Sequence, residues 1–246
     1  LNAFDLNSAA KKDSTCTGAT CDRYDRLDWT NAFDQDGDGV FEQALSGSAL
    51  PIDLTSDLYY NVGGSVDSLE FAAGPITVTG SAGFSFERRT LDVNTPEGTL
   101  FGAQLDNLSV TGLSGKISVN DSESADLAMA SVAVTGGSLA IARVTPASSP
   151  TDLNPTTRYR ALRMSDVTVA TGLPSFGLTG SITLNALDLN SAAEKGDAGS
   201  ERYERLDWTN AFDFDGDGTF DQALSGSALP INLTSDLHYA VDGGVT

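Results

Sequence analysis

A segment near the start of the chain returns almost unchanged near its end. The stretch LNAFDLNSAA at 1–10 recurs as LNALDLNSAA at 184–193, and residues 23–67 align without a gap to residues 202–246, with 35 identities over 45 positions. The copies are 183 residues apart at the first stretch and 179 apart at the second, because the first copy holds four extra residues between them. Such a tandem repeat is typical of proteins that stack one structural unit on the next.

The repeat divides the chain into three parts. Residues 1–67 are the C-terminal part of one repeat and carry an acidic loop, residues 68–183 are the hairpin-rich remainder of the next repeat, and residues 184–246 are a second copy of the first segment. The repeat pattern is cut at both ends of the sequence, so we expect the chain to belong to a longer array. Near-identical copies also argue against an enzyme, since a catalytic centre is seldom duplicated along a chain.

Apolar residues alternate with polar ones over much of the chain, which predicts half-buried β-strands. Four stretches each combine two such runs with a Gly-containing turn: 68–86, 107–119, 131–144 and 166–184. Glycine permits the positive φ that tight turns need, so the sequence predicts at least four antiparallel β-hairpins in each period. In SITLNALDL, Ile182 and Leu184 share one face before the alternation shifts at Asn185.

Isolated hairpins cannot bury an apolar face alone, so the predicted strands must join into a larger all-β structure. Two architectures satisfy this requirement. One is an elongated β-structure in which the sheet runs continuously from period to period, and the other is a row of tandem β-sandwich domains. The continuous structure is favoured, because no Pro- or Ser-rich linker separates the copies.

The charge balance excludes several classes of partner. The chain has 34 acidic and 14 basic residues, a net charge of −20. Non-specific nucleic-acid binding needs clustered Lys and Arg, and an anionic lipid surface would repel the chain. No apolar run reaches the roughly 18 residues that a membrane-spanning helix needs. We therefore expect no nucleic acid and no membrane insertion, whereas the acidic excess favours binding of cations.

An acidic loop occurs once in each copy, as DQDGDGVFE at 34–42 and DFDGDGTFD at 213–221. Asp stands at loop positions 1, 3 and 5, and an acid stands at position 9, as in the first half of an EF-hand loop. Gly39 or Gly218 stands at position 6, where glycine allows the sharp turn that such a loop makes. Calcium takes six to eight oxygen ligands, and this spacing supplies most of them. The predicted ligands are Asp34, Asp36, Asp38, the Val40 carbonyl and Glu42, and in the second copy Asp213, Asp215, Asp217, the Thr219 carbonyl and Asp221.

The loop departs from an EF-hand at position 12, where Leu45 and Leu224 replace the bidentate Glu. What remains resembles the shorter acidic loops of extracellular calcium modules of the dockerin, integrin and thrombospondin types. The alternative is an acidic hairpin turn without metal, since Asp-Gly is also favoured in hairpins. That alternative leaves three neighbouring carboxylates to repel one another in both copies.

Cys16 and Cys21 lie in the stretch that only the first copy contains. Their spacing is not that of a common metal-binding pair, and no second pair or His cluster accompanies them. A local disulfide is the favoured interpretation, and it would place the protein in an oxidising compartment. Two unlinked thiols are the alternative.

Aromatic residues flank each acidic loop in the repeated segment RLDWTNAF. We interpret Trp29, Trp208, Phe33 and Phe212 as anchors that pack the loop onto the sheet, with a sugar-stacking Trp platform as the alternative. The chain has one His, His238, and the first copy has Tyr there, which argues against general-base catalysis. No nucleophile or nucleotide-binding motif appears, so an enzyme is not expected.

Five strings carry a resemblance to a known class of proteins: residues 74–93, 105–112, 136–146, 159–169 and 27–39. They resemble the long repeats of giant bacterial surface proteins, which include calcium-binding RTX-type adhesins and very large repeat proteins of marine and planctomycete-type bacteria. The resemblance implies export to the cell surface, repeats stiffened by Ca²⁺, and a role in cell adhesion, surface filaments or biofilm matrix.

Two hypotheses for the function therefore remain. The first is a structural repeat of an extracellular fibre, adhesin stalk or matrix protein, whose partners are neighbouring repeats or identical chains arranged head to tail. The second is an extracellular module that binds carbohydrate. Buried tryptophans favour the first, and a solvent-facing Trp favours the second.

Overall fold

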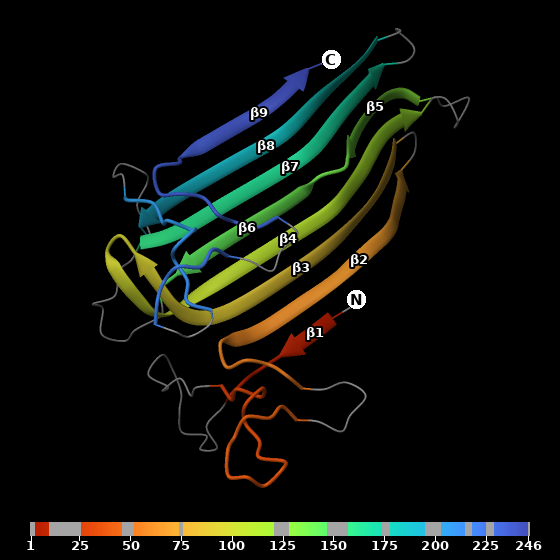
Figure 1. Ribbon diagram of the computed structural model, residues 1–246. Coiled ribbons are helices and arrows are strands. Elements are labelled where there is room, and N and C mark those ends of the chain that lie inside the picture. Colours follow the sequence, from red (N-terminus) through yellow and green to blue (C-terminus); the bar gives the residue numbers. More distant parts are fainter. Residues whose placement is uncertain are drawn as a thin grey trace, which may run out of the picture.

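The computed structural model places nine strands in a single antiparallel sheet (Figure 1). It describes residues 3–9, 26–45, 52–73, 76–120, 128–146, 157–173, 178–194, 203–214, 218–224 and 229–245, and no helix occurs among them. The strands are β1 (Ala3–Leu6), β2 (Leu58–Ala73), β3 (Ile76–Thr95), β4 (Gly98–Asn120), β5 (Ala128–Thr135), β6 (Ser138–Thr145), β7 (Thr157–Leu173), β8 (Leu178–Glu194) and β9 (Tyr239–Val245). The predicted all-β fold with one continuous antiparallel sheet is confirmed.

Sequence order is also spatial order across the sheet, except at one position. β5 and β6 lie end to end between β4 and β7, and each pairs with both of these neighbours. The predicted hairpins at 68–86 and 166–184 are confirmed as β2–β3 and β7–β8. The hairpins predicted at 107–119 and 131–144 are wrong, because the first stretch lies inside β4 and the second is the broken strand β5–β6. Their glycines bend strands instead of reversing them.

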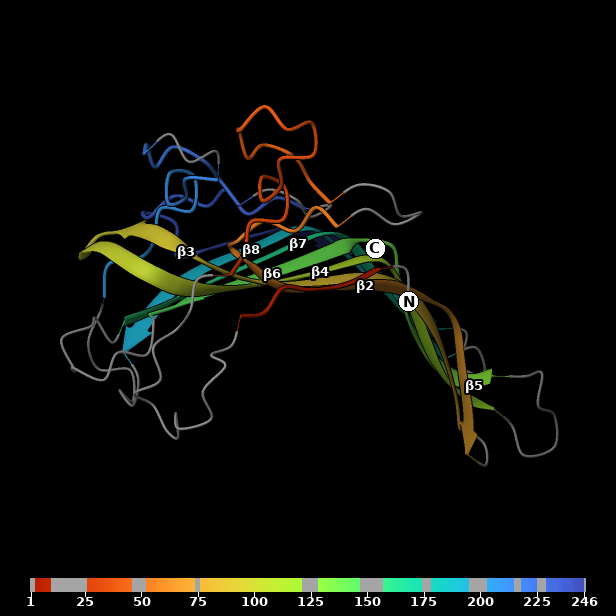
Figure 2. The same ribbon diagram turned by 90° about the horizontal axis from the view of Figure 1, so that it is seen from below.

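A line of irregularities crosses the sheet. Register shifts fall between Val66 and Leu69, between Ser81 and Gly83, and between Leu184 and Ala186. The break between β5 and β6 lies at Gly136 and Gly137, which have φ of 74° and 86°, and Asp166 on β7 has φ of 57°. Extra residues of this kind kink a strand and increase its twist. Figure 2 shows the sheet bending downward toward the end that contains β5, and the phase shift expected at Asn185 belongs to this line.

Two compact loop segments lie on one face of the sheet (Figure 2). We call them the first module (the described residues of 26–57) and the second module (the described residues of 203–238). The second module and the sheet share one buried cluster. Its sheet members are Val93, Leu100, Ala103, Leu105, Ala140, Ala142, Val144, Tyr159 and Ala161, and its module members are Leu206, Trp208, Ala211, Phe212, Leu224, Ile231 and Leu233. The second module therefore covers β3, β4, β6 and β7.

The opposite face of the sheet carries a continuous row of apolar side chains. Directly paired residues point to the same face, and the row runs from β1 to β9 as Phe4, Val62, Phe86, Leu108, Ile141, Leu162, Leu189 and Tyr239. Each member is paired directly with an apolar residue on the adjacent strand, and such cross-strand pairs are the unit by which sheets are stabilised.

The sequence repeat is also a repeat of strand pairing. In the first copy Ala3 pairs with Gly63 and Leu6 with Tyr60, and in the second copy Ala186 pairs with Asp242 and Leu189 with Tyr239, which are the corresponding residues. β8 and β9 are therefore β1 and β2 again, six strand positions further along the sheet. Six is an even number, so the repeated strands run in the same directions as the originals.

Candidate calcium loop and its supporting module

Each acidic loop is the tip of a small hairpin within its module. Phe33 and Gln43 exchange two backbone hydrogen bonds of 3.2 and 3.1 Å at the base of the first loop. The side-chain oxygen of Gln43 also accepts a 2.7 Å hydrogen bond from the backbone N–H of Gln35. Phe212 and Gln222 form the same pair in the second module, so the two loops share one scaffold.

The aspartates of the first loop organise its backbone. Asp34 accepts hydrogen bonds from the N–H groups of Gly37 and Gly39, at 2.7 and 3.0 Å, and Asp38 accepts one from Val40 at 2.8 Å. Gly39 has φ of 88°, in the left-handed region that favours glycine. This matches the sharp turn predicted at loop position 6, and Gly218 repeats it with φ of 85°.

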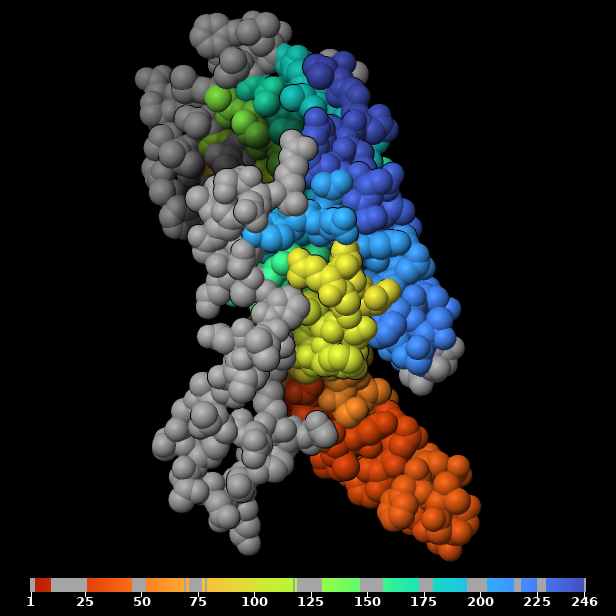
Figure 3. All heavy atoms as spheres, turned by 90° about the vertical axis from the view of Figure 1, so that its left-hand side faces the viewer, coloured from red at the N-terminus to blue at the C-terminus, as the bar shows by residue number. Residues whose placement is uncertain are grey.

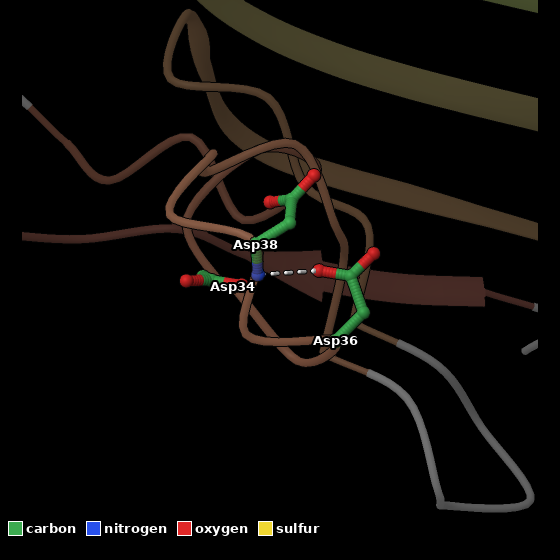
Figure 4. A group of neighbouring side chains, drawn as sticks. All are labelled: Asp34, Asp36 and Asp38. Atoms are coloured by element: carbon green, nitrogen blue, oxygen red, sulfur yellow. Dashed lines mark hydrogen bonds between the residues drawn. The ribbon is translucent and has the colours of Figure 1, made fainter.

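Three of the predicted ligands come together in the first loop (Figure 4). Asp34, Asp36 and Asp38 each offer a carboxylate oxygen, and these oxygens lie within 4.8 Å of one another. Calcium–oxygen distances are about 2.3–2.6 Å, so two ligands of one ion are up to about 5 Å apart. The donor chemistry and the spacing therefore fit Ca²⁺. The hydrogen bonds alone also account for the loop's shape, which is the acidic-hairpin alternative.

The remaining predicted ligands are less closely gathered. Val40 and Glu42 are exposed, and Glu42 is not part of the group of three aspartates. In the second loop, Asp213 is half-buried, whereas Thr219 and Asp221 are exposed. Asp215 and Asp217 lie outside the described residues.

A buried asparagine connects each module to the sheet, and the sequence interpretation missed it. Asn190, on β8, donates from Nδ2 to the carbonyls of Leu206 and Thr234, at 2.9 and 3.0 Å. Its Oδ1 accepts a 3.1 Å hydrogen bond from the indole N–H of Trp208. Asn7 makes the corresponding three bonds in the first copy, to Leu27, Thr55 and Trp29. The available signal was the recurrence of this Asn in both copies of the LN-A-x-DLN segment.

A second recurrent feature is a turn around each tryptophan, which an aspartate side chain closes by hydrogen bonds. The carboxylate of Asp28 accepts hydrogen bonds from the Thr30 N–H and hydroxyl and from the Asn31 amide, at 3.0, 2.5 and 3.0 Å. Burial acts to raise the pKa of Asp28, but these hydrogen bonds outweigh it and hold the pKa below its usual value. Asp207 binds Thr209 and Asn210 in the same way.

An ion-pair cluster lies on the sheet face opposite the modules. Asp106 on β4 is flanked by its directly paired neighbours, Arg88 on β3 and Arg143 on β6, each at 2.5 Å. Burial acts to raise the pKa of Asp106, but the hydrogen bonds and charges of the two arginines outweigh it, so the net shift is downward. The cluster joins three strands and has the character of a structural tie.

The two tryptophans differ in their burial. Trp208 and Phe212 are completely buried against the sheet, which confirms them as anchors, whereas Trp29 and Phe33 are half-buried. His238 is exposed and its ring contacts that of Tyr239 edge-on. Cys16 and Cys21, with the disulfide predicted between them, lie outside the described residues.

Comparison with protein-family models finds no match to this chain, and neither curated proteins nor solved structures match it. Within the described part of the chain, no helix is both long and apolar enough to cross a membrane.

Proposed function

We propose that the chain is a structural repeat of an extracellular fibre, adhesin stalk or matrix protein, in which one β-sheet grows by six strands with each repeat. The observation that carries the proposal is the pairing of β8 with β9 in the same register as β1 with β2. Equal register and equal strand direction mean that the end of one period presents the same pairing surface as its beginning.

The repeat length has a mechanical consequence. Neighbouring strands lie about 4.8 Å apart, so six strand positions advance the sheet by roughly 29 Å. A sheet hydrogen-bonded without interruption transmits force through many backbone bonds, and the absence of a linker leaves no flexible joint. A stiff, twisted ribbon is the expected form of the assembled array.

Calcium binding by the acidic loops is part of the proposal. The gathered oxygens of Asp34, Asp36 and Asp38 support it, and an ion there would relieve repulsion within a chain of net charge −20. Extracellular loops of this type bind at roughly 10⁻⁴–10⁻³ M, which suits a compartment rich in Ca²⁺. The resemblance to giant bacterial surface proteins supports a location at the cell surface.

The carbohydrate-binding alternative needs an exposed aromatic platform. Trp208 is completely buried and binds Asn190 through its only polar atom, so it cannot stack on a sugar in this structure. Trp29 is half-buried and makes the equivalent bond. These contacts support the structural role in preference to a sugar-binding role.

The proposed continuous ribbon is tested by lengthening the chain. Placing a copy of residues 58–183 directly before Leu1 restores the sequence of a whole period, because residue 1 corresponds to residue 184. Small-angle scattering is expected to show one rigid particle that is longer by roughly 24 Å, because residues 58–183 add the five strand positions from β2 to β7. A flexible pair of separate globules would contradict a continuous sheet.

A further inference from the structure

The two modules have nearly the same sequence but very different environments. Three apolar residues of the first module, Leu27, Leu45 and Ile52, are 49, 37 and 37% exposed. The corresponding residues of the second module, Leu206, Leu224 and Ile231, are 0, 2 and 0% exposed. Figure 3 shows the same contrast, with the second module (blue) packed beside β3 and β4 (yellow) and the first module (orange) projecting away.

The difference in exposure does not come from a difference in module structure. Leu45 pairs with Ile52 as Leu224 pairs with Ile231. Trp29 donates to Asn7 across 3.4 Å, and Trp208 donates to Asn190 across 3.1 Å. Each module therefore reaches the same internal fold, but among the described residues only the second module has an apolar surface against it.

The surface that covers the second module is an apolar patch on β3, β4, β6 and β7. It is formed by Leu105 on β4, Ala140, Ala142 and Val144 on β6, and Tyr159 and Ala161 on β7, with Val93, Leu100 and Ala103 nearby. The small alanines of β6 and β7 leave room for the large side chains of the module. One backbone bond also joins the two parts, from the N–H of Asn94 to the carbonyl of Ala211 at 3.0 Å.

We propose that the apolar face of the first module (Leu27, Trp29, Phe33, Leu45, Ile52 and Leu54) is a docking surface for a further copy of this sheet face. The occupant is a repeat body equivalent to β2–β7, placed before β1, because β1 itself corresponds to β8. The chain's own β4–β6–β7 face cannot serve, because the second module already covers it. The inference rests on the repeat role proposed above, and it is independent of calcium and of cellular location.

The charges of Asp5 on β1 and Asp53 in the first module independently match this occupant. In the second copy, Arg163 of β7 binds Asp188 at 2.9 Å and also donates to the Pro230 carbonyl and the Asn232 side chain. The first copy has Asp5 where the second has Asp188, and Asp53 where the second has Asn232. The arginine of the docked copy that corresponds to Arg163 would therefore meet two carboxylates. Arg163 itself meets one carboxylate and one amide, so the electrostatic attraction should be stronger in the docked contact.

The same occupant would also complete β1. The repeated strand β8 pairs with β7 on one side and β9 on the other, whereas β1 pairs only with β2 among the described strands. Phe4 and Leu6 of β1 are 61 and 53% exposed. A body that seats the first module would bring its own β7 alongside β1, so one partner would fill both surfaces.

Tryptophan accessibility tests the proposal. The chain carrying Trp208→Phe has Trp29 as its only tryptophan, and the added residues 58–183 contain none. We expect acrylamide to quench Trp29 strongly in the 246-residue chain. In the chain extended before Leu1, the quenching should fall to the level of Trp208, measured in the Trp29→Phe chain. Equal quenching of Trp29 with and without the added copy would overturn the proposal.

Two variants separate docking from other effects. Asp53→Arg places like charges together only in the docked state, so it should restore quenching of Trp29 in the extended chain and leave the 246-residue chain unchanged. If Asp53→Arg leaves the quenching of Trp29 in the extended chain low, the proposed contact with Arg163 of the added copy is wrong. An extended chain that scatters as a rigid ribbon but keeps Trp29 accessible would refute docking and leave the proposed continuous sheet intact, whereas a flexible particle would refute the sheet itself.

Discussion

The indole N–H of Trp208 donates a hydrogen bond to the side-chain oxygen of Asn190 across 3.1 Å, and both residues are completely buried. The bond joins strand β8 to the second module. Because the amide of Asn190 also binds two module carbonyls, a single side chain fixes where the module leaves the sheet and how it returns. The same arrangement at Asn7 shows that this junction is a fixed element of the repeat.

Replacing Asn190 with Ala should destabilise the chain. The change leaves the Trp208 N–H and the buried Leu206 carbonyl without these partners, whereas the Thr234 carbonyl keeps its hydrogen bond from the Leu237 N–H. Each unsatisfied buried group costs about 1–3 kcal/mol. We expect a loss of about 3 kcal/mol or more in the free energy of unfolding, measured with urea. Asn7→Ala is the matched control and should cost less, because Trp29 is only half-buried and water can replace the lost bonds. A larger effect at Asn7 than at Asn190 would contradict this account.

The Asp106 cluster should make stability depend on acid pH. The pKa of Asp106 is lowered in the folded state, so its ionised form stabilises the fold above its unfolded pKa of about 3.9. That contribution is lost as the pH falls through the folded pKa. Asp106→Asn should cost about 1.5–3 kcal/mol at pH 6, from hydrogen bonds to charged groups, and progressively less below about pH 4. Urea unfolding at several pH values measures this difference.

The control for Asp106 is Asp53→Asn, which introduces the residue that the second copy already has at this exposed position. It should change stability by less than about 0.5 kcal/mol at either pH. A constant difference between the original chain and Asp106→Asn from pH 6 to pH 3 would show that Asp106 is not the titrating group.

Calcium should bind to two sites in each chain and stabilise the fold. At a free concentration ten times the dissociation constant, one site adds about 1.4 kcal/mol by mass action. Titration calorimetry should therefore show two ions, and chelation should lower the melting temperature. Asp36→Asn with Asp38→Asn should remove one of the two ions, while the exposed Asp67→Asn should remove none. No calcium uptake and no response to chelator would favour the acidic hairpin turn without metal.

Gly137 should be intolerant of any side chain. A Cβ there would lie 2.6 Å from the Ser165 carbonyl oxygen and 2.5 Å from a methyl group of Val167, and φ is 86°. Gly137→Ala should therefore cost more than the roughly 1–3 kcal/mol of backbone strain alone. Gly102→Ala isolates that strain, because Gly102 has φ of 61° and its nearest neighbour would be 4.0 Å away. Equal losses at the two positions, measured by urea unfolding, would rule out the close contact as the cause.

The class of fold followed from local sequence features. Alternation of apolar residues depends only on which side chains face a core, so it predicted strands and the phase shift at Asn185. The glycine-containing turns between the runs predicted antiparallel pairing. The loop position of Gly39 predicted the sharp turn at which the structure has a φ of 88°, because that turn also depends on local sequence. What failed was the role of Gly112 and of Gly136–Gly137. Glycine permits a turn or a bulge equally well, and the choice depends on the neighbouring strands. β3 and β5–β6 pair with β4 on its two sides around Gly112, and β4 and β7 flank Gly136–Gly137, so the chain bends there without reversing.

In the candidate site, too, some features follow from local sequence and others depend on tertiary structure. The acidic spacing predicted that Asp34, Asp36 and Asp38 would gather, because a short loop is determined by its own residues. The burial of the tryptophans could not be predicted in this way. Trp29 and Trp208 stand in nearly identical sequences, but only Trp208 has the β4–β6–β7 face against it. Sequence alone determined the module, whereas tertiary structure decided whether its apolar face is covered, since that depends on strands distant along the chain.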